Sequence, residues 1–232
     1  MKTIGPVRSI SILPTRGVAR PQVAFLVVAA LAASLVVVAE FSPAGGATDA
    51  RGSKRAYTVP ATNCLNNSAT IQATGPNQTT MGTLGNDTIY GTSGDDIIYA
   101  LAGDDLICGF GGDDDLYGGD NRDSIGGFSG NDEISGGDGR DELVGNPGMD
   151  TIKGGAARDA LVGKAGDDTL FGGDGDDLLW GSGDDDTLNG NDGSDALSGG
   201  PGIDTCDGGD PPPGGGADTA TGSCDSSTNV NP

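Results

Sequence analysis

The sequence predicts an all-β protein whose centre is a solenoid, a chain wound into stacked coils. A nine-residue repeat runs without insertion from Gly82 to Asp207. Its first six positions are rich in Gly, Asp and Asn, which favour turns and tolerate positive φ angles. Its last three positions place one inward apolar residue between two outward ones, as in a short β-strand. A turn and a strand in regular alternation stack into a solenoid.

Four positions of the repeat are nearly constant over 14 consecutive blocks. Position 1 is Gly in 13 blocks, with Ala100 as the exception, and position 4 is Gly in 11. Position 6 is Asp in all 14, and position 8 is Ile or Leu in 13, with Cys206 in the last. Such constancy over 126 residues indicates one structural unit repeated along the chain.

Charge in the repeat segment favours cations as partners. Residues 82–207 hold 29 acidic and five basic residues, a net charge of −24. Such a segment repels nucleic acid and anionic lipid, so we expect no nucleic-acid partner. The chain contains no His, the commonest general base, and no G-x-S-x-G, P-loop or EF-hand motif. We therefore expect no enzymatic activity.

The repeat resembles G-G-x-G-x-D-x-U-x, the nonapeptide of the RTX (haemolysin-type) calcium-binding family. The resemblance covers a little over half of the chain, and the catalytic or toxin domains of that family have no counterpart here. It implies a right-handed parallel β-roll of about seven coils, each made of two blocks. Block n then stacks on block n+2, which places residues 18 apart on neighbouring strands ~4.8 Å from each other.

On that stacking, position 8 forms two inward ladders that face each other as the core. One ladder consists of Ile89, Ile107, Ile125, Leu143, Leu161, Leu179 and Leu197. The other consists of Ile98, Leu116, Ile134, Ile152, Leu170, Leu188 and Cys206.

Stacking also places each position-6 Asp beside another Asp 18 residues away. Carboxylates this close repel each other, and a divalent ion between them reverses the sign of the interaction. Calcium takes about six to eight oxygen ligands from carboxylates and backbone carbonyls. The resemblance implies ions shared between adjacent coils. Because the apolar core alone is too thin to offset the entropy of ordering the chain, we expect the repeat segment to be mostly disordered without them. The ligands that it implies are Asp87, Asp96, Asp105, Asp114, Asp123, Asp132, Asp141, Asp150, Asp159, Asp168, Asp177, Asp186, Asp195 and Asp204.

The N-terminus has the features of an export signal. Basic residues from Lys2 to Arg20 precede an apolar run from Val23 to Ala39, and small residues follow near Ala47. We expect residues 1–47 to be a signal peptide and the mature protein to be secreted, in solution or associated with the cell surface, with no membrane span. A retained membrane anchor is the alternative interpretation.

The remaining segments flank the array. We expect a linker over 48–63, an N-terminal cap of decayed repeats over 64–81, the β-roll over 82–207, a C-terminal cap over 208–224 and a flexible tail over 225–232. Caps cover the open end coils of a solenoid. Four cysteines in an exported chain favour disulfides, and of the three pairings we favour Cys64–Cys108 and Cys206–Cys224, because each pair brackets one end of the array. We expect a monomer.

Two surface rows have alternative interpretations. Arg122, Arg140 and Arg158 stack on one face, as local charge compensation or as a patch for anionic glycan or phosphate. Outward aromatic residues could pack across strands or stack on sugars. These residues are Tyr90, Tyr99, Tyr117, Phe171 and Trp180.

The favoured function is calcium binding by a secreted protein. The alternative is a calcium-scaffolded adhesion module that binds cell-wall or extracellular glycan.

Overall fold

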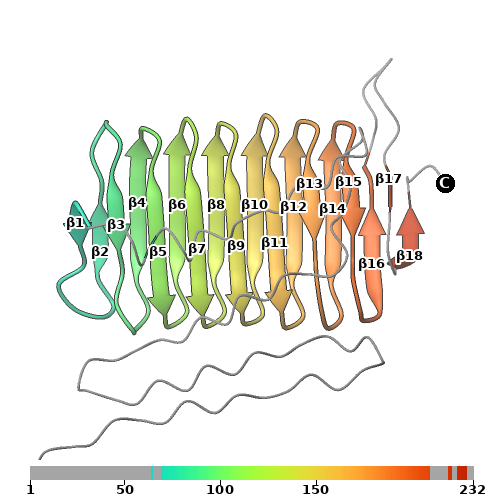
Figure 1. Cartoon of the computed structure of the whole chain (residues 1–232), viewed down its shortest axis with the longest axis horizontal. Coiled ribbons are helices and arrows are strands. Elements are labelled where there is room, and N and C mark those ends of the chain that lie inside the picture. The colour runs from blue at the N-terminus through green and yellow to red at the C-terminus, as the bar shows by residue number, and fades with distance from the viewer. Residues whose placement is uncertain (1–63, 65–68, 210–218, 221–223, 229–232) are drawn as a thin grey trace, which may run out of the picture. The chain divides into compact units, whose positions relative to one another are not determined.

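The protein is a parallel β-solenoid, as the sequence predicts. The computed structural model describes Cys64 and residues 69–209, 219–220 and 224–228, which form two nine-stranded parallel sheets (Figure 1). The predicted signal peptide and linker lie outside the described residues. Within those residues, no helix is long and apolar enough to span a membrane.

The strands alternate between the two sheets along the chain, so each half-coil crosses from one sheet to the other. The odd sheet contains β1 (Ile71–Gln72), β3 (Thr88–Tyr90), β5 (Leu106–Gly111), β7 (Ser124–Ser129), β9 (Glu142–Pro147), β11 (Ala160–Ala165), β13 (Leu178–Trp180), β15 (Ala196–Ser198) and β17 (Thr219–Ala220). The even sheet contains β2 (Thr79–Met81), β4 (Ile97–Ala102), β6 (Asp115–Asp120), β8 (Glu133–Asp138), β10 (Thr151–Ala156), β12 (Thr169–Asp174), β14 (Thr187–Asp192), β16 (Asp204–Asp207) and β18 (Cys224–Thr228).

The register between neighbouring strands follows the period of the sequence. From β1 to β16, paired residues are 18 positions apart, as in the pairs Ile71 with Ile89 and Ile152 with Leu170. Two nine-residue blocks therefore make one coil, and block n stacks on block n+2. The period breaks beyond the repeats, where β18 pairs with β16 through an irregularity between Asp204 and Thr205.

Most strands are longer than the three residues that the repeat pattern predicts. From β4 to β12, every strand has six residues, because pairing continues through positions 1 to 3 of the following block. In β4, for example, Leu101 and Ala102 pair with Gly119 and Asp120 of the next coil. The turns are therefore confined to positions 4 to 6, and the position-6 Asp is the residue that ends each turn.

The core consists of the two predicted ladders. Every position-8 side chain from Ile89 to Cys206 is at most 1% exposed, and together they form one cluster with Ala100. Ile71 and Cys224 pack against its two ends. The core is therefore one side chain wide per strand, and each coil contributes only two apolar residues to it.

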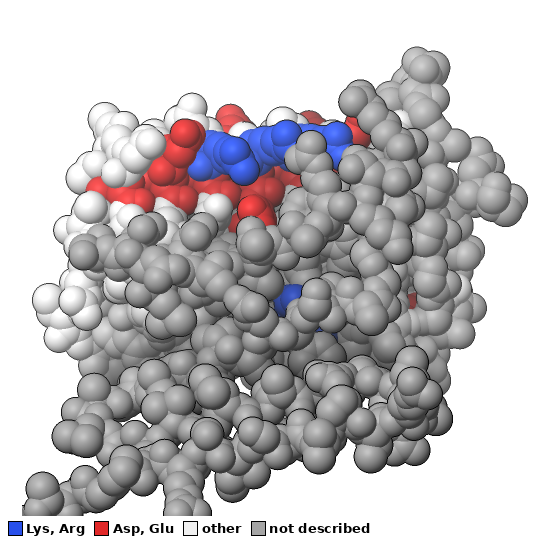
Figure 2. Space-filling view, in the orientation of Figure 1, with Lys and Arg blue, Asp and Glu red and all other residues white. Residues whose placement is uncertain are grey.

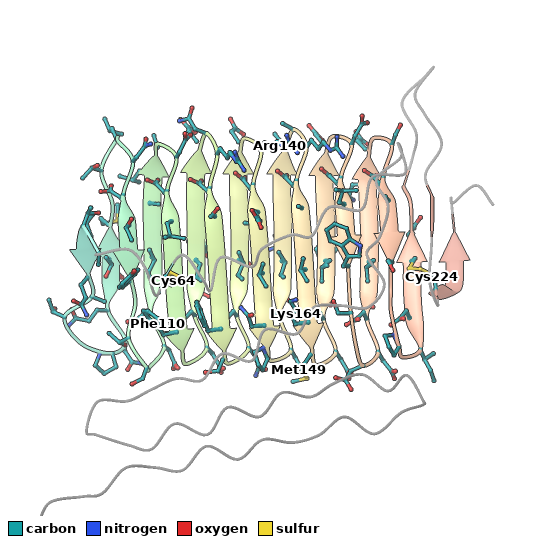
Figure 3. The ribbon with its side chains drawn as sticks, viewed as in Figure 1. Cys64, Phe110, Arg140, Met149, Lys164 and Cys224 are labelled. Carbon is teal, nitrogen blue, oxygen red and sulfur yellow. A yellow bond between two sulfur atoms is a disulfide. The ribbon has the colours of Figure 1, made fainter. Side chains whose placement is uncertain are left out.

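A disulfide joins the chain at each end of the array, with the predicted pairing. Cys64 is bonded to Cys108 and Cys206 to Cys224 (Figure 3). Cys64 lies on the outer face of the odd sheet, where Tyr90 donates a hydrogen bond to its carbonyl oxygen. Cys64 and Cys108 also pack with Phe110 and other apolar neighbours in a second, smaller cluster. Both covalent links suit an oxidising compartment.

Leu143→Ala tests the thin core. Leu143 is fully buried in the middle of the odd ladder, so its truncation would leave a cavity in a core that is one side chain wide. We expect this substitution to lower the free energy of unfolding of the calcium-loaded chain by about 2–5 kcal/mol in denaturant titrations. Ser135→Ala, on the outer face of β8, is the control and should cost about 0.5 kcal/mol or less. Equal effects of the two substitutions would contradict this assignment of the core.

Candidate metal sites

The aspartates at position 6 form two rows along opposite edges of the solenoid. Odd-numbered blocks place theirs on the edge that carries Arg140, and even-numbered blocks on the edge that carries Met149 (Figure 3). Asp87 is 9% exposed, and the others are 0–3% exposed. Fourteen carboxyl groups are therefore buried in a protein whose apolar core has about as many side chains.

One oxygen of each carboxyl group links consecutive coils. The backbone N–H of each position-6 aspartate from Asp87 to Asp186 donates to Oδ1 of the aspartate 18 residues later, as from Asp132 to Asp150 at 2.8 Å. Twelve such bonds of 2.7–3.0 Å run from Asp87 to Asp204. These bonds determine the orientation of each side chain, and hence where its second oxygen points.

The second oxygen, Oδ2, is buried without a hydrogen-bond partner in ten of these residues. A buried charged oxygen in this state carries a large free-energy cost unless an ion or a donor satisfies it. Such a cost, repeated over five successive coils, points to a ligand as the partner of these oxygens. The ten residues are Asp105, Asp114, Asp123, Asp132, Asp141, Asp150, Asp159, Asp168, Asp177 and Asp186.

Glycine at position 1 leaves room for this oxygen. A Cβ atom on Gly145 would overlap Oδ2 of Asp150, and one on Gly163 would overlap Oδ2 of Asp168. The same conflict recurs at Gly109, Gly127 and most other position-1 glycines. The near-invariance of Gly at position 1 is therefore a packing requirement of the carboxyl group five residues later.

The backbone beside each carboxyl group is held in an unusual conformation. From the third block onward, position 2 has a positive φ angle in every block, including non-glycine residues such as Leu101 (86°), Phe110 (78°) and Lys164 (104°). Bulky residues rarely adopt this conformation, which costs on the order of 1–3 kcal/mol at each position. Strain of this kind persists where other interactions compensate for it, and a cation held by the turn would be one.

Burial and mutual repulsion disfavour the charged form of the position-6 carboxyl groups when no metal is bound. Burial raises the pKa of Asp159 and Asp168 to about 8, and neighbouring carboxylates add to this. Burial raises the pKa of Asp114, Asp123, Asp150 and Asp186 to about 7 and that of Asp132, Asp141 and Asp177 to about 6. Burial therefore favours the protonated form of these groups, and a cation at the free oxygen would favour the charged form instead.

The residues present fit calcium. Calcium binds oxygen atoms only and takes ligands from both carboxylates and backbone carbonyls. No group of three or more His, Cys, Asp or Glu side chains suited to a metal occurs among the residues that the structure describes. A calcium ion at the free Oδ2 would therefore depend on turn carbonyls for much of its coordination, which suits a glycine-rich turn.

Asp87 and Asp96 differ from the other predicted ligands. Oδ2 of Asp87 accepts hydrogen bonds from the backbone N–H and hydroxyl of Thr83, and Asp96 has the same arrangement with Thr92. Burial of Asp87 raises its pKa, but the bonds from Thr83 and Thr70 outweigh burial and lower the pKa below its usual value. The repeat pattern alone does not reveal this difference, although position 2 is Thr in these two blocks only.

The basic row lies beside one row of aspartates. Arg122, Arg140 and Arg158 are exposed on the odd-block edge, next to a band of acidic side chains (Figure 2). Their charges oppose the rise that burial causes in the pKa of Asp141, Asp159 and Asp177, one coil further along. The arrangement supports local charge compensation, one of the two interpretations of this row.

The outward aromatic side chains pack against each other. Tyr99 and Tyr117 stack with ring centroids 4.7 Å apart and an interplanar angle of 8°. Tyr90 lies edge-on to Phe110 at 5.4 Å, and Phe110 contacts Phe128 at 5.3 Å. Cross-strand packing therefore accounts for Tyr90, Tyr99 and Tyr117 without a sugar ligand.

Comparison with known families agrees with this geometry. The model of the RTX calcium-binding nonapeptide repeat matches residues 81–109, 109–143, 135–170, 144–179 and 171–206. The matched segments together span more than half of the chain and include both rows of aspartates. No curated protein matches the chain.

The raised pKa values predict that acid partly replaces metal. Carboxyl groups whose pKa is higher in the folded, metal-free chain stabilise it fully below their unfolded pKa of about 3.9. That stabilisation is lost as the pH rises through 6 to 8.

In excess chelator, we expect circular dichroism to show more β-structure at about pH 5 than at about pH 8. With saturating calcium the dependence should reverse, because protons then compete with the ion. Less β-structure at the lower pH in chelator would contradict this electrostatic account.

Proposed function

Because the chain belongs to the RTX calcium-binding nonapeptide repeat family, we propose that it is an exported protein whose repeats fold as they bind extracellular calcium. The proposed ligands are the position-6 aspartates of the sequence prediction, through Oδ2, together with turn carbonyls. The observation that carries the proposal is the row of buried Oδ2 atoms without a donor.

The charge of the array supports binding of many ions rather than one. Residues 82–207 carry a net charge of −24. About twelve divalent ions, one for each pair of stacked blocks, would bring a charge of ~+24. Full occupancy would therefore neutralise the repeats and remove the repulsion between coils.

Folding is coupled to binding in this proposal because the apolar core is small. Each coil buries two position-8 side chains, while about 18 residues lose conformational freedom. Ligands that are available only in the folded chain contribute their binding free energy to folding. Calcium binding would supply the free energy of folding that the small apolar core lacks.

The proposed location follows from the calcium affinity and the cysteines. Extracellular calcium modules bind with dissociation constants of about 10⁻⁴–10⁻³ M, well above the cytosolic calcium concentration. Disulfides such as Cys64–Cys108 form in oxidising compartments. A chain with these properties would leave the cell unfolded and become ordered outside, in line with the signal peptide proposed for residues 1–47.

Removal of calcium tests coupled folding. In excess chelator at neutral pH, the mature chain with its disulfides intact should lose most of its β-type circular dichroism and regain it with millimolar calcium. Magnesium at the same concentration is the control and should restore little, because it requires a smaller octahedral site. A β-type spectrum that persists unchanged in chelator would contradict the proposal.

Sequencing of the exported chain tests the proposed processing. If residues 1–47 are a cleaved signal, the protein recovered from culture medium should begin close to Thr48. Recovery of the chain only from the membrane fraction, with residues 1–47 retained, would instead support the alternative of an anchor.

A further inference from the structure

The first two turns of the array are closed by threonine side chains. The backbone N–H and Oγ1 of Thr83 each donate to Oδ2 of Asp87, both at 2.8 Å. Thr92 does the same for Asp96, at 2.7 and 2.8 Å. Both donors lie four residues before the aspartate, so each turn supplies its own partner for the oxygen that the later turns leave without one.

The later turns use a different backbone at the same position. Leu101 and Phe110, which occupy position 2 in the next two blocks, have φ angles of 86° and 78°. Oδ2 of Asp105 and of Asp114 has no partner there. Threonine is branched at Cβ and strongly disfavours a positive φ angle. Threonine at position 2 therefore selects the turn in which the N–H and hydroxyl groups point at the carboxylate.

The other oxygen of each carboxyl group in the first coil also lacks the usual aspartate neighbour. Oδ1 of Asp87 accepts from the hydroxyl of Thr70 at 3.2 Å, and Oδ1 of Asp96 lies 3.5 Å from the backbone nitrogen of Gln78. The residues 18 positions before Asp87 and Asp96 are Ala69 and Gln78, where later coils have an aspartate. The stacked position before either residue therefore offers no second carboxylate to be bridged.

We propose that Thr83 and Thr92 take the place of a metal ion at Asp87 and Asp96, so that metal uptake begins at Asp105. The coil over residues 82–99 then closes without calcium and presents β3 and β4 as a template for the first calcium-dependent coil. This inference rests on the proposed function, because it divides the predicted ligands into ten or more that bind calcium and two that do not.

Two matched pairs of substitutions test the division. One variant is Asp87→Asn with Asp96→Asn, and the other is Asp105→Asn with Asp114→Asn. An asparagine carbonyl can accept the threonine bonds in the first pair, whereas in the second its NH₂ group replaces a metal-ligating oxygen. Calcium bound per chain would be measured by equilibrium dialysis in saturating calcium. The first variant should bind as many ions as the unsubstituted chain, and the second about two fewer.

The outcomes separate this inference from the proposed function. Equal loss of calcium in both variants, with the unsubstituted chain binding many ions, would overturn the inference and leave the proposed function standing. An unsubstituted chain that binds no calcium would instead overturn the proposed function.

A second measurement does not depend on the folding of the aspartate variants. Thr83→Val with Thr92→Val keeps the side-chain shape and removes both hydroxyl donors, and Thr169→Val with Thr187→Val on the outer face is the control. The increase in stability with the logarithm of calcium concentration reports how many ions bind on folding. The first pair should lower stability by a similar amount at every calcium concentration and leave this slope unchanged. A changed slope, or stability equal to that of the control pair, would overturn the inference.

Discussion

The structure depends on one buried carboxylate oxygen in every half-coil. Hydrogen bonding between coils directs Oδ1 of each aspartate toward the preceding backbone, as between Asp132 and Asp150, and this leaves Oδ2 facing a glycine. A charged oxygen in that position costs several kcal/mol unless a cation or a donor meets it. The requirement recurs at nine-residue steps, and it explains why Gly at position 1 and Asp at position 6 are the least variable features of the repeat.

The array has two parts, which differ in what can satisfy this oxygen: a first coil with hydrogen-bond donors of its own, and a long body of later coils without them. In the first coil the partner belongs to the chain itself, as the N–H and hydroxyl of Thr92. In the later coils the chain supplies none to the oxygens from Asp105 to Asp186, and it also holds residues such as Phe110 at a positive φ angle. The body therefore combines a thin apolar core with buried oxygens that a cation could satisfy, and the proposed dependence on calcium rests on both features.

Much of this architecture is predictable from the sequence. The 18-residue register and the two ladders follow once two blocks make one coil, which the resemblance to the RTX repeat implies. The pairing of Cys64 with Cys108 follows separately, because each cysteine pair brackets one end of the array. The six-residue strands do not, because Gly-rich positions 1 to 3 have weak strand preferences and pair only when coils stack. The role of Thr83 is also hidden, because position 2 varies between blocks and the sign of its φ angle depends on the side chain present. The constant positions of the repeat thus determine how the coils stack. The variable position 2 determines whether a turn donates hydrogen bonds to its own aspartate.

Anomalous diffraction from crystals grown with calcium would test the central claim most directly. The account predicts two rows of calcium peaks along the two edges of the solenoid, each within coordination distance of Oδ2 from Asp105, Asp114 or one of their equivalents further along. An ordered solenoid in saturating calcium that shows no peak beside these oxygens would contradict it.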